Sequence, residues 1–119
     1  MIEIYKEFSF DSAHSLPNVP DDHKCKRVHG HTYRVRILLR GKLDEHYGWV
    51  EDFGNLKSIC KPVIDQLDHR YLNEIKGLEN PTAEIITQWI WQKIKPKLPL
   101  LHEIYLKETP SSGCFYRGE

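Results

Sequence analysis

Two histidines separated by a single residue, His29 and His31, have a spacing that suits metal ligands on a β-strand. Residues two apart on a strand point to the same face. The residues that follow at the same parity, from Tyr33 to Leu39, are apolar, which marks that face as the one directed to the core. Gly30, between the two histidines, allows another segment to approach the backbone closely. Imidazoles at the mouth of such a face need partners.

A third histidine, His14, shares its parity with the apolar Phe8 and Phe10 and follows the first predicted strand. If the two strands form a hairpin, His14 returns to the end of the sheet where the other two histidines lie. Three neutral imidazoles suit zinc, and a site with three protein ligands leaves a fourth position open for water or substrate. Alternatively, these are ordinary histidines satisfied by hydrogen bonds, and His23 is a possible substitute ligand.

The second group of candidates consists of one thiol and one acid–histidine pair. Cys25 lies four residues before His29 and is flanked by two lysines and an arginine, a setting that favours a basic or nucleophilic thiolate. It is alternatively an inert loop residue, as we expect Cys60 and Cys114 to be packing residues. Asp68 and His69 form a carboxylate–imidazole pair suited to acid–base catalysis, or an exposed pair without a function.

A carboxylate, Glu108, falls on the apolar parity of a predicted strand over residues 101–108. A buried carboxylate needs donors, and Lys107 or Arg117 is a possible partner. A ligand with two adjacent N–H donors would also satisfy both of its oxygens. The alternative is a glutamate at the strand end that turns to solvent.

These residues are held by six predicted elements in the order strand, strand, helix, helix, strand, strand. Proline and charged residues over 15–28 indicate a loop, Pro62 is expected to kink or interrupt the first helix, and Asn80 and Pro81 are expected to begin the second. Strands on both sides of a helix pair favour an antiparallel sheet with helices on one face, the α+β class. The predicted strands cover 1–10, 29–39, 101–108 and 114–117, and the helices run from Phe53 to Leu67 and from Pro81 to about Ile94.

Composition narrows the class of protein. A chain of 119 residues is expected to form a single domain over 1–119. Lys plus Arg (17) equals Asp plus Glu (17), which gives no electrostatic footprint for nucleic acid or an anionic membrane. No apolar run approaches the roughly 18 residues that span a bilayer, and no signal peptide is evident. Three cysteines without framework spacing favour a reducing, cytoplasmic location.

Five segments of the chain are distinctive in composition and order: F-S-F-D-S-A-H, C-K-R-V-H-G-H-T-Y, L-D-H-R-Y-L-N, N-P-T-A-E and K-E-T-P-S-S-G-C-F-Y-R-G-E. Together they resemble the 6-pyruvoyl tetrahydropterin synthase family, and most closely its bacterial branch, the 6-carboxy-5,6,7,8-tetrahydropterin synthases of queuosine biosynthesis. The resemblance implies the tunnelling fold, in which subunits join edge to edge into a barrel, commonly a trimer, and two such rings stack as a hexamer with active sites at subunit interfaces.

The resemblance also implies a role for each candidate residue. The histidines would be the Zn²⁺ ligands, Cys25 the proton acceptor, and Asp68 with His69 an acid–histidine relay. Glu108 would anchor the 2-amino and N3 groups of a pterin. Family members often carry threonine where Ala83 stands; a backbone contact to the substrate would survive this change, whereas a hydroxyl contact would not. The implied metal ligands are His14, His29 and His31, and the implied pterin-pocket residues are Thr82, Ala83 and Glu84.

The implied reaction is that of a zinc-dependent lyase. It would convert 7,8-dihydroneopterin triphosphate into 6-carboxy-5,6,7,8-tetrahydropterin and release triphosphate and acetaldehyde. The three-residue gap between Cys25 and His29 resembles the bacterial branch, whereas the biopterin-forming branch usually has a longer gap. The alternatives are 6-pyruvoyl tetrahydropterin synthesis at the same site, or a non-enzymatic zinc-binding assembly domain.

Overall fold

The structure, a computed structural model, describes residues 1–119, and its four strands form one antiparallel sheet in the order β1-β2-β3-β4. Side chains along β2 alternate between buried and more exposed positions from Tyr33 to Leu39, as a strand with one face in the core requires. The strands are β1 (Ile2–His14), β2 (His29–Gly41), β3 (Leu101–Thr109) and β4 (Ser112–Tyr116).

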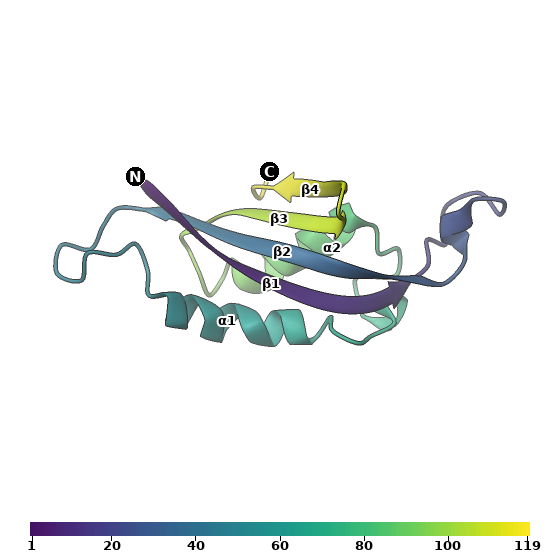
Figure 1. The fold of residues 1–119 in the computed structure, drawn as a ribbon, viewed down its shortest axis with the longest axis horizontal. Coiled ribbons are helices and arrows are strands. Elements are labelled where there is room, and N and C mark those ends of the chain that lie inside the picture. Colours follow the sequence, from purple (N-terminus) through teal and green to yellow (C-terminus); the bar gives the residue numbers. More distant parts are fainter.

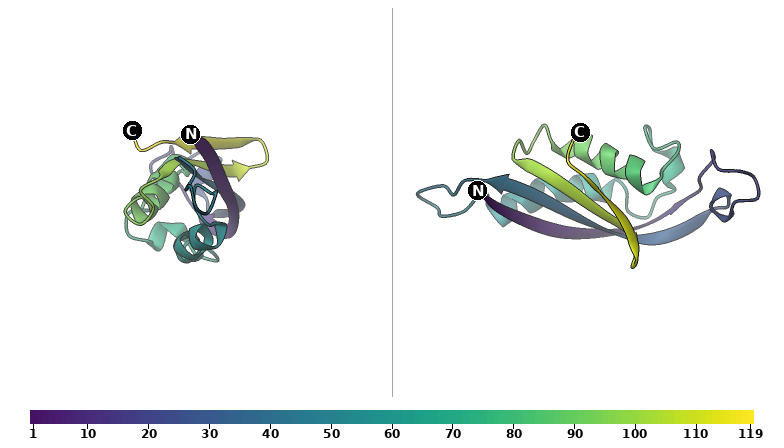
Figure 2. Two further views of the ribbon diagram at one scale, coloured as in Figure 1. Left: turned by 90° about the vertical axis from the view of Figure 1, so that its left-hand side faces the viewer. Right: turned by 90° about the horizontal axis from the view of Figure 1, so that it is seen from above.

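Two helices, α1 (Phe53–Asp65) and α2 (Ala83–Ile94), cover one face of the sheet and leave the other face without a helical layer (Figure 1, Figure 2). Two short 3-10 helices, η1 (Lys24–Lys26) and η2 (Leu72–Glu74), lie in the connecting segments. This is the α+β arrangement that the order of elements predicted, and the fold class is therefore confirmed.

The hydrophobic core lies between the inner face of the sheet and the two helices. Twenty-one buried residues form one cluster, to which every layer contributes. Members from the sheet include Tyr33, Val35, Ile37 and Leu39, and members from the helices include Leu56, Cys60, Ile64, Ile86, Ile90 and Ile94.

Several predicted boundaries are wrong. β1 does not end near residue 10, because residues 11–14 remain paired with residues 29–32 of β2. Pro62 does not interrupt α1, since Val63 and Ile64 beyond it pack into the core and hold the last turn. α2 is capped by Thr82 rather than Asn80: the Thr82 side chain accepts a hydrogen bond of 3.2 Å from the Ile85 N–H.

The molecule is elongated, with principal extents of 57 × 24 × 22 Å. The loop that contains η1 projects from one end of the sheet, and the connection between β2 and α1 projects from the other (Figure 1). No helix has both the length and the apolar character needed to cross a membrane.

Candidate metal centre and adjoining cavities

Three imidazoles converge at the end of the β1–β2 hairpin next to the η1 loop. The register places His14 opposite His29, and His31 lies one inward position further along β2. Ring centroids are 4.5 Å apart for His14 and His29, 5.1 Å for His14 and His31, and 5.0 Å for His29 and His31. One ring nitrogen from each side chain lies within 4.8 Å of the other two, as a shared metal would require.

Backbone carbonyl groups fix the orientation of two of these rings. The Nδ1 atom of His14 lies 2.8 Å from the carbonyl oxygen of Pro81, and that of His29 lies 2.7 Å from the carbonyl oxygen of Arg27. A carbonyl oxygen only accepts, so Nδ1 carries the proton in both rings and Nε2 keeps its lone pair. The Tyr33 hydroxyl makes a long contact of 3.4 Å with Nε2 of His14. Metal-binding histidines are usually held in this way.

The third ring, His31, has a buried Nε2 atom without a hydrogen-bond partner. The atom lies 3.1 Å from Oε1 of Glu108. This distance allows electrostatic attraction, but the two groups are not aligned for a hydrogen bond. Burial lowers the pKa of His31, although the Glu108 carboxylate acts in the opposite direction. Burial also lowers the pKa of His14, against the raising effect of the Pro81 carbonyl. Both shifts favour the neutral imidazole, which has a nitrogen lone pair that can bind a metal ion.

This donor set fits a transition-metal ion. It offers three imidazoles: two have an unprotonated Nε2 because Nδ1 is bonded to a carbonyl group, and one has a buried Nε2 without a hydrogen-bond partner. A second group, Asp11, Asp68 and His69, also brings its ligand atoms within 4.8 Å of one another. The Asp11 carboxylate already accepts from the Thr32 hydroxyl, and the Asp68 carboxylate is paired with His69 and with the N–H of Asp11, so these side chains are not left without partners.

Cys25 lies beside the metal centre. It is the middle residue of η1, and its N–H donates to Nδ1 of His23 over 3.0 Å, so the exposed His23 serves as a cap of this helix. A cavity of about 480 Å³ is lined by Cys25 together with His29, His31 and Glu108. The thiol therefore faces the same space as two of the three imidazoles.

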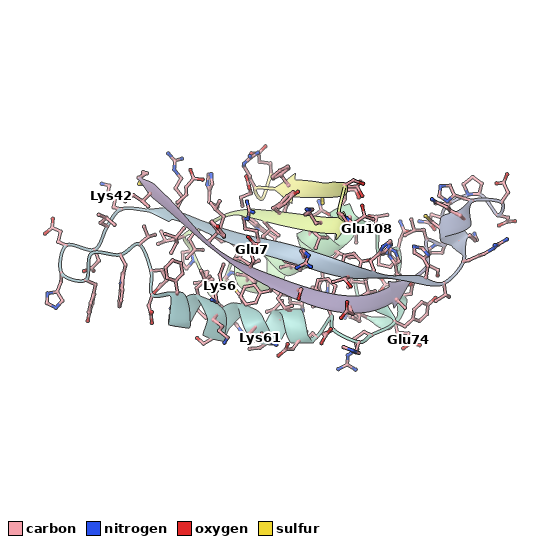
Figure 3. The ribbon with its side chains drawn as sticks, in the orientation of Figure 1. Lys6, Glu7, Lys42, Lys61, Glu74 and Glu108 are labelled. Atoms are coloured by element: carbon pink, nitrogen blue, oxygen red, sulfur yellow. The ribbon has the colours of Figure 1, made fainter.

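Glu108 closes another side of this cavity. β3–β4 pairing runs from Lys107 opposite Gly113 to Thr109 opposite Ser112, which leaves Glu108 at a bulge, and bulges redirect side chains. Figure 3 shows Glu108 at the end of β3 close to the turn into β4. Arg117, one of the partners considered for it, instead pairs with Glu103 over 2.7 Å. Among the ion pairs, the Glu108 carboxylate thus has only the His31 imidazole beside it.

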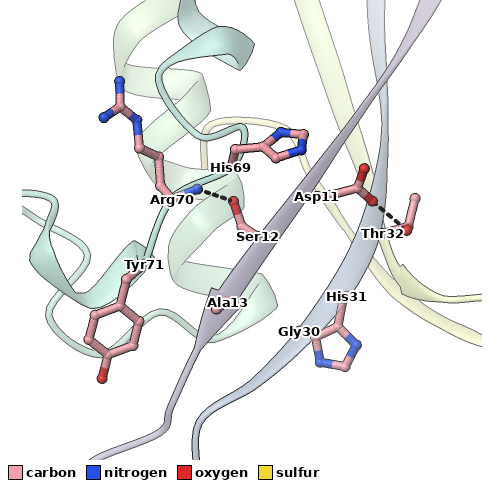
Figure 4. A pocket seen from close by; sticks show the side chains of 9 residues that line it. All are labelled: Asp11, Ser12, Ala13, Gly30, His31, Thr32, His69, Arg70 and Tyr71. Atoms are coloured by element: carbon pink, nitrogen blue, oxygen red, sulfur yellow. Dashed lines mark hydrogen bonds between the residues drawn. The ribbon is translucent and has the colours of Figure 1, made fainter.

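Asp68 and His69 do contact each other, with 3.0 Å between Asp68 Oδ1 and His69 Nδ1. The N–H of Asp11 also donates to this carboxylate, and this bond, followed by the one from His69, holds the pKa of Asp68 below its usual value. Figure 4 shows His69 beside Asp11 at a cavity of about 600 Å³ that Cys25 does not line. Asp11 and Thr32 stand on the face opposite the metal centre.

The predicted pterin-pocket residues begin α2. Thr82 caps the helix. Ala83 is only 8% exposed, and its carbonyl oxygen accepts a hydrogen bond of 2.7 Å from the Thr87 hydroxyl. Pro81, the residue before Thr82, bonds to His14, so this segment adjoins the metal centre. Glu84 is exposed.

Sequence reasoning missed several groups that shape the site. The carbonyl groups of Arg27 and Pro81 orient two imidazoles, and the backbone of Asp11 holds the Asp68–His69 pair. Backbone groups occur in every residue, so the type of a residue does not indicate that its carbonyl group will orient a ligand. The segment N-P-T-A-E, which contains Pro81, is the part of the sequence that comes closest to indicating such a contact.

Comparison with known proteins places the chain among pterin enzymes. The sequence model described as 6-pyruvoyl tetrahydropterin synthase matches residues 3–119. A 6-carboxy-5,6,7,8-tetrahydropterin synthase from Synechocystis sp. is 41% identical, and the alignment covers 95% of this chain and 91% of that protein. One from Haemophilus influenzae is 37% identical, and the alignment covers 98% of this chain and 99% of that protein. The structure of 6-pyruvoyl tetrahydropterin synthase from Caenorhabditis elegans superposes with a TM-score of 0.92 at 28% identity, covering 99% and 96%.

Proposed function

The chain belongs to the 6-pyruvoyl tetrahydropterin synthase family, and on that premise we propose that it is a zinc-dependent 6-carboxy-5,6,7,8-tetrahydropterin synthase. It would convert 7,8-dihydroneopterin triphosphate into 6-carboxy-5,6,7,8-tetrahydropterin and release triphosphate and acetaldehyde, a step of queuosine biosynthesis. Relatives from Synechocystis sp. and Haemophilus influenzae that bear this name, at 41% and 37% identity, support that choice. The three-residue gap between Cys25 and His29 supports it as well.

The observation that carries the proposal is the set of three imidazoles with free ring nitrogens. His14 and His29 would bind zinc through Nε2 because their Nδ1 atoms are bonded to carbonyl groups, and His31 would bind through its unpartnered Nε2. When bound, the metal supplies Lewis acidity toward the side-chain oxygens of the substrate. With three protein ligands, a coordination position remains for the substrate.

Glu108 would hold the pterin ring. Its carboxylate lines the cavity shared with Cys25 and the imidazoles, and its side chain is 26% exposed. The 2-amino group and N3 of a pterin present two parallel N–H donors, which match the two oxygens of a carboxylate. With the ring bound there, the pterin side chain would extend toward two of the three histidines and the thiol of Cys25, which line the same cavity. The start of α2, over Thr82, Ala83 and Glu84, would line the same pocket.

Proton transfer requires two sets of residues that one chain does not bring together. Cys25 lines the cavity at the metal centre, whereas His69 lines the other cavity, which His31 also borders but Cys25 does not. Asp68 bonds to His69 and to the N–H of Asp11. We therefore place Cys25, as proton acceptor, and the Asp68–His69 relay of a second copy in one active site. Strand β4 and the part of β1 before residue 11 have an edge available for pairing with another copy, whereas residues 11–13 of β1 already bond to residues 69–71. A barrel of three copies, stacked as a hexamer, fits this requirement.

The test is to incubate the purified protein with 7,8-dihydroneopterin triphosphate and identify the pterin product. Formation of 6-carboxy-5,6,7,8-tetrahydropterin together with acetaldehyde supports the proposal. A 6-pyruvoyl product without acetaldehyde would instead assign the biopterin-branch activity, which the likeness to the Caenorhabditis elegans structure also favours.

A second measurement separates an enzyme from a non-enzymatic zinc-binding assembly domain. Cys25→Ala removes the proposed proton acceptor and leaves the three imidazoles in place. Loss of turnover with zinc content unchanged supports catalysis. If the unmodified protein binds zinc but turns over neither substrate nor analogue, the assembly role gains support instead.

A further inference from the structure

The segment after α1 lies along the free edge of β1. The His69 N–H donates to the carbonyl oxygen of Asp11 over 2.6 Å, and the Ala13 N–H donates to the carbonyl oxygen of Arg70 over 2.9 Å. Ala13 and Tyr71 also form an isolated parallel bridge. Residues 69–71 thus act as a short fifth strand beside the end of β1.

His69 has an unusual backbone conformation within this segment. Its φ angle is 56°, in the left-handed region that residues other than glycine seldom adopt. Such a conformation persists where surrounding contacts determine it. Its imidazole is 79% exposed, so side-chain packing does not supply those contacts. Hydrogen bonds to β1 must therefore hold the residue.

Ser12 of β1 bonds to the chain on both sides of the Asp68–His69 pair. Its hydroxyl donates to the carbonyl oxygen of Leu67, and it accepts from the Arg70 N–H over 3.5 Å. The residue is only 7% exposed, so little solvent reaches these bonds. On the outer face, the Thr32 hydroxyl bonds to the Asp11 carboxylate over 2.5 Å and steadies the neighbouring part of β1.

We propose that Ser12 is a positioning residue, which locks the Asp68–His69 pair against β1 through hydrogen bonds to Leu67 and Arg70. Without these bonds, His69 relaxes from the left-handed conformation and its imidazole leaves the carboxylate of Asp68. The catalytic consequence rests on the proposed function, in which His69 moves protons. The local structural consequence does not depend on it.

The experiment compares Ser12→Ala with two controls. Ser58→Ala removes a serine hydroxyl that bonds to the Asn55 carbonyl over 2.9 Å on exposed α1. Ile94→Val removes one methylene group from the core at the last residue of α2. It controls for effects that come only from a general loss of stability. Deuterium exchange of peptides that cover residues 66–71 reports on the segment, and kcat, KM and zinc content report on the site.

We expect Ser12→Ala to raise deuterium uptake over residues 66–71 and to lower kcat by about 10–100-fold, the scale of a misplaced catalytic group. KM, zinc content and exchange in β2 stay as in the unmodified protein, and neither control shows this pattern. If Ser12→Ala does not melt cooperatively, Ser12→Cys replaces it with the same expectations, because its thiol is only a weak donor.

Unchanged uptake over residues 66–71 overturns the proposal, as does a loss of kcat no larger than that of Ile94→Val. If the unmodified protein shows no turnover of the pterin triphosphate, the proposed function fails. In that event deuterium uptake over residues 66–71 is the remaining test. A local rise in Ser12→Ala supports Ser12 as the residue that positions the Asp68–His69 pair, and no rise overturns it.

Discussion

The Nδ1 atom of His14, on β1, lies 2.8 Å from the carbonyl oxygen of Pro81, just before α2. The two residues are 67 positions apart in the chain. This contact joins the sheet to the start of the helix and leaves Nε2 of His14 unprotonated, with a lone pair that can bind a metal. The metal centre therefore depends on how the helical layer docks, as well as on the hairpin that carries the three histidines.

His14→Ala should abolish stable zinc binding, because two imidazoles cannot complete a tetrahedral site. We expect the affinity to fall by more than the roughly 10–100-fold that follows loss of an outer partner. Zinc content after dialysis and competition with a chelator measure it. His46→Ala is the matched control, since His46 is exposed in the loop between β2 and α1. Equal zinc content in both variants would refute the assignment of His14.

The three thiols should differ strongly in reactivity. Burial raises the pKa of Cys60 to about 12 and raises that of Cys114, whereas Cys25 is partly exposed in η1. With a pKa of about 12, only about one Cys60 in 10⁴ is ionised at pH 8, and the thiolate is the reactive form. Alkylation of the native, zinc-free protein at pH 8 should therefore label Cys25 first, as peptide mapping would show. Early labelling at Cys60 would contradict this burial.

Asp68 should add acid sensitivity to the fold. Its pKa is lowered in the folded state by the N–H of Asp11 and then by His69. A lowered pKa means that the carboxylate stabilises the fold above the unfolded value of about 3.9, and that this contribution is lost as pH falls below it. Asp68→Asn keeps an oxygen acceptor but removes the charge. The difference in Tm between the two proteins should be constant from pH 5 to 7 and shrink below pH 4. A constant difference down to pH 2 would exclude this linkage.

The strand parities could be predicted from local sequence. Alternation along residues 29–39 places His29, His31 and Tyr33 on one face, and a hairpin then returns His14 to the same end. Both inferences use only the alternation of side chains along a strand and the connection over residues 15–28 between two consecutive strands, so they depend on one continuous stretch of sequence. The structure agrees with this geometry.

Other parts of the site could not be predicted, because they join segments far apart in the chain through backbone groups. Ser12 reaches Leu67 across 55 positions, and nothing in the type of either residue indicates the contact. The cap of α2 was misassigned because Asn80 and Thr82 are both good capping residues, and only the fold selects Thr82. The bulge at Glu108 likewise depends on pairing with β4.

Gly113→Ala should destabilise the β3–β4 hairpin. A Cβ atom at this position would lie 2.3 Å from the carbonyl oxygen of Leu106, which belongs to the backbone and cannot move aside. We expect the free energy of unfolding to fall by about 1–3 kcal/mol, as for overpacked sites. Gly54→Ala is the control, because its Cβ would meet nothing closer than 3.4 Å and alanine favours the helix. Denaturant unfolding measures both, and equal stability of the two variants would contradict the close approach.

Cys25 and His69 should complement each other between copies of the chain. They line different cavities of one copy, so we expect Cys25→Ala and His69→Ala each to lose most turnover alone. If an active site takes Cys25 from one copy and His69 from another, equal co-expression of the two variants leaves about one site in four with both groups, by random assembly of a symmetric oligomer. Turnover of the mixture should then approach about a quarter of that of the unmodified protein. A mixture no more active than the sum of its components would place both groups in the same copy, and a single chain would then have to bring together the two cavities that Cys25 and His69 line.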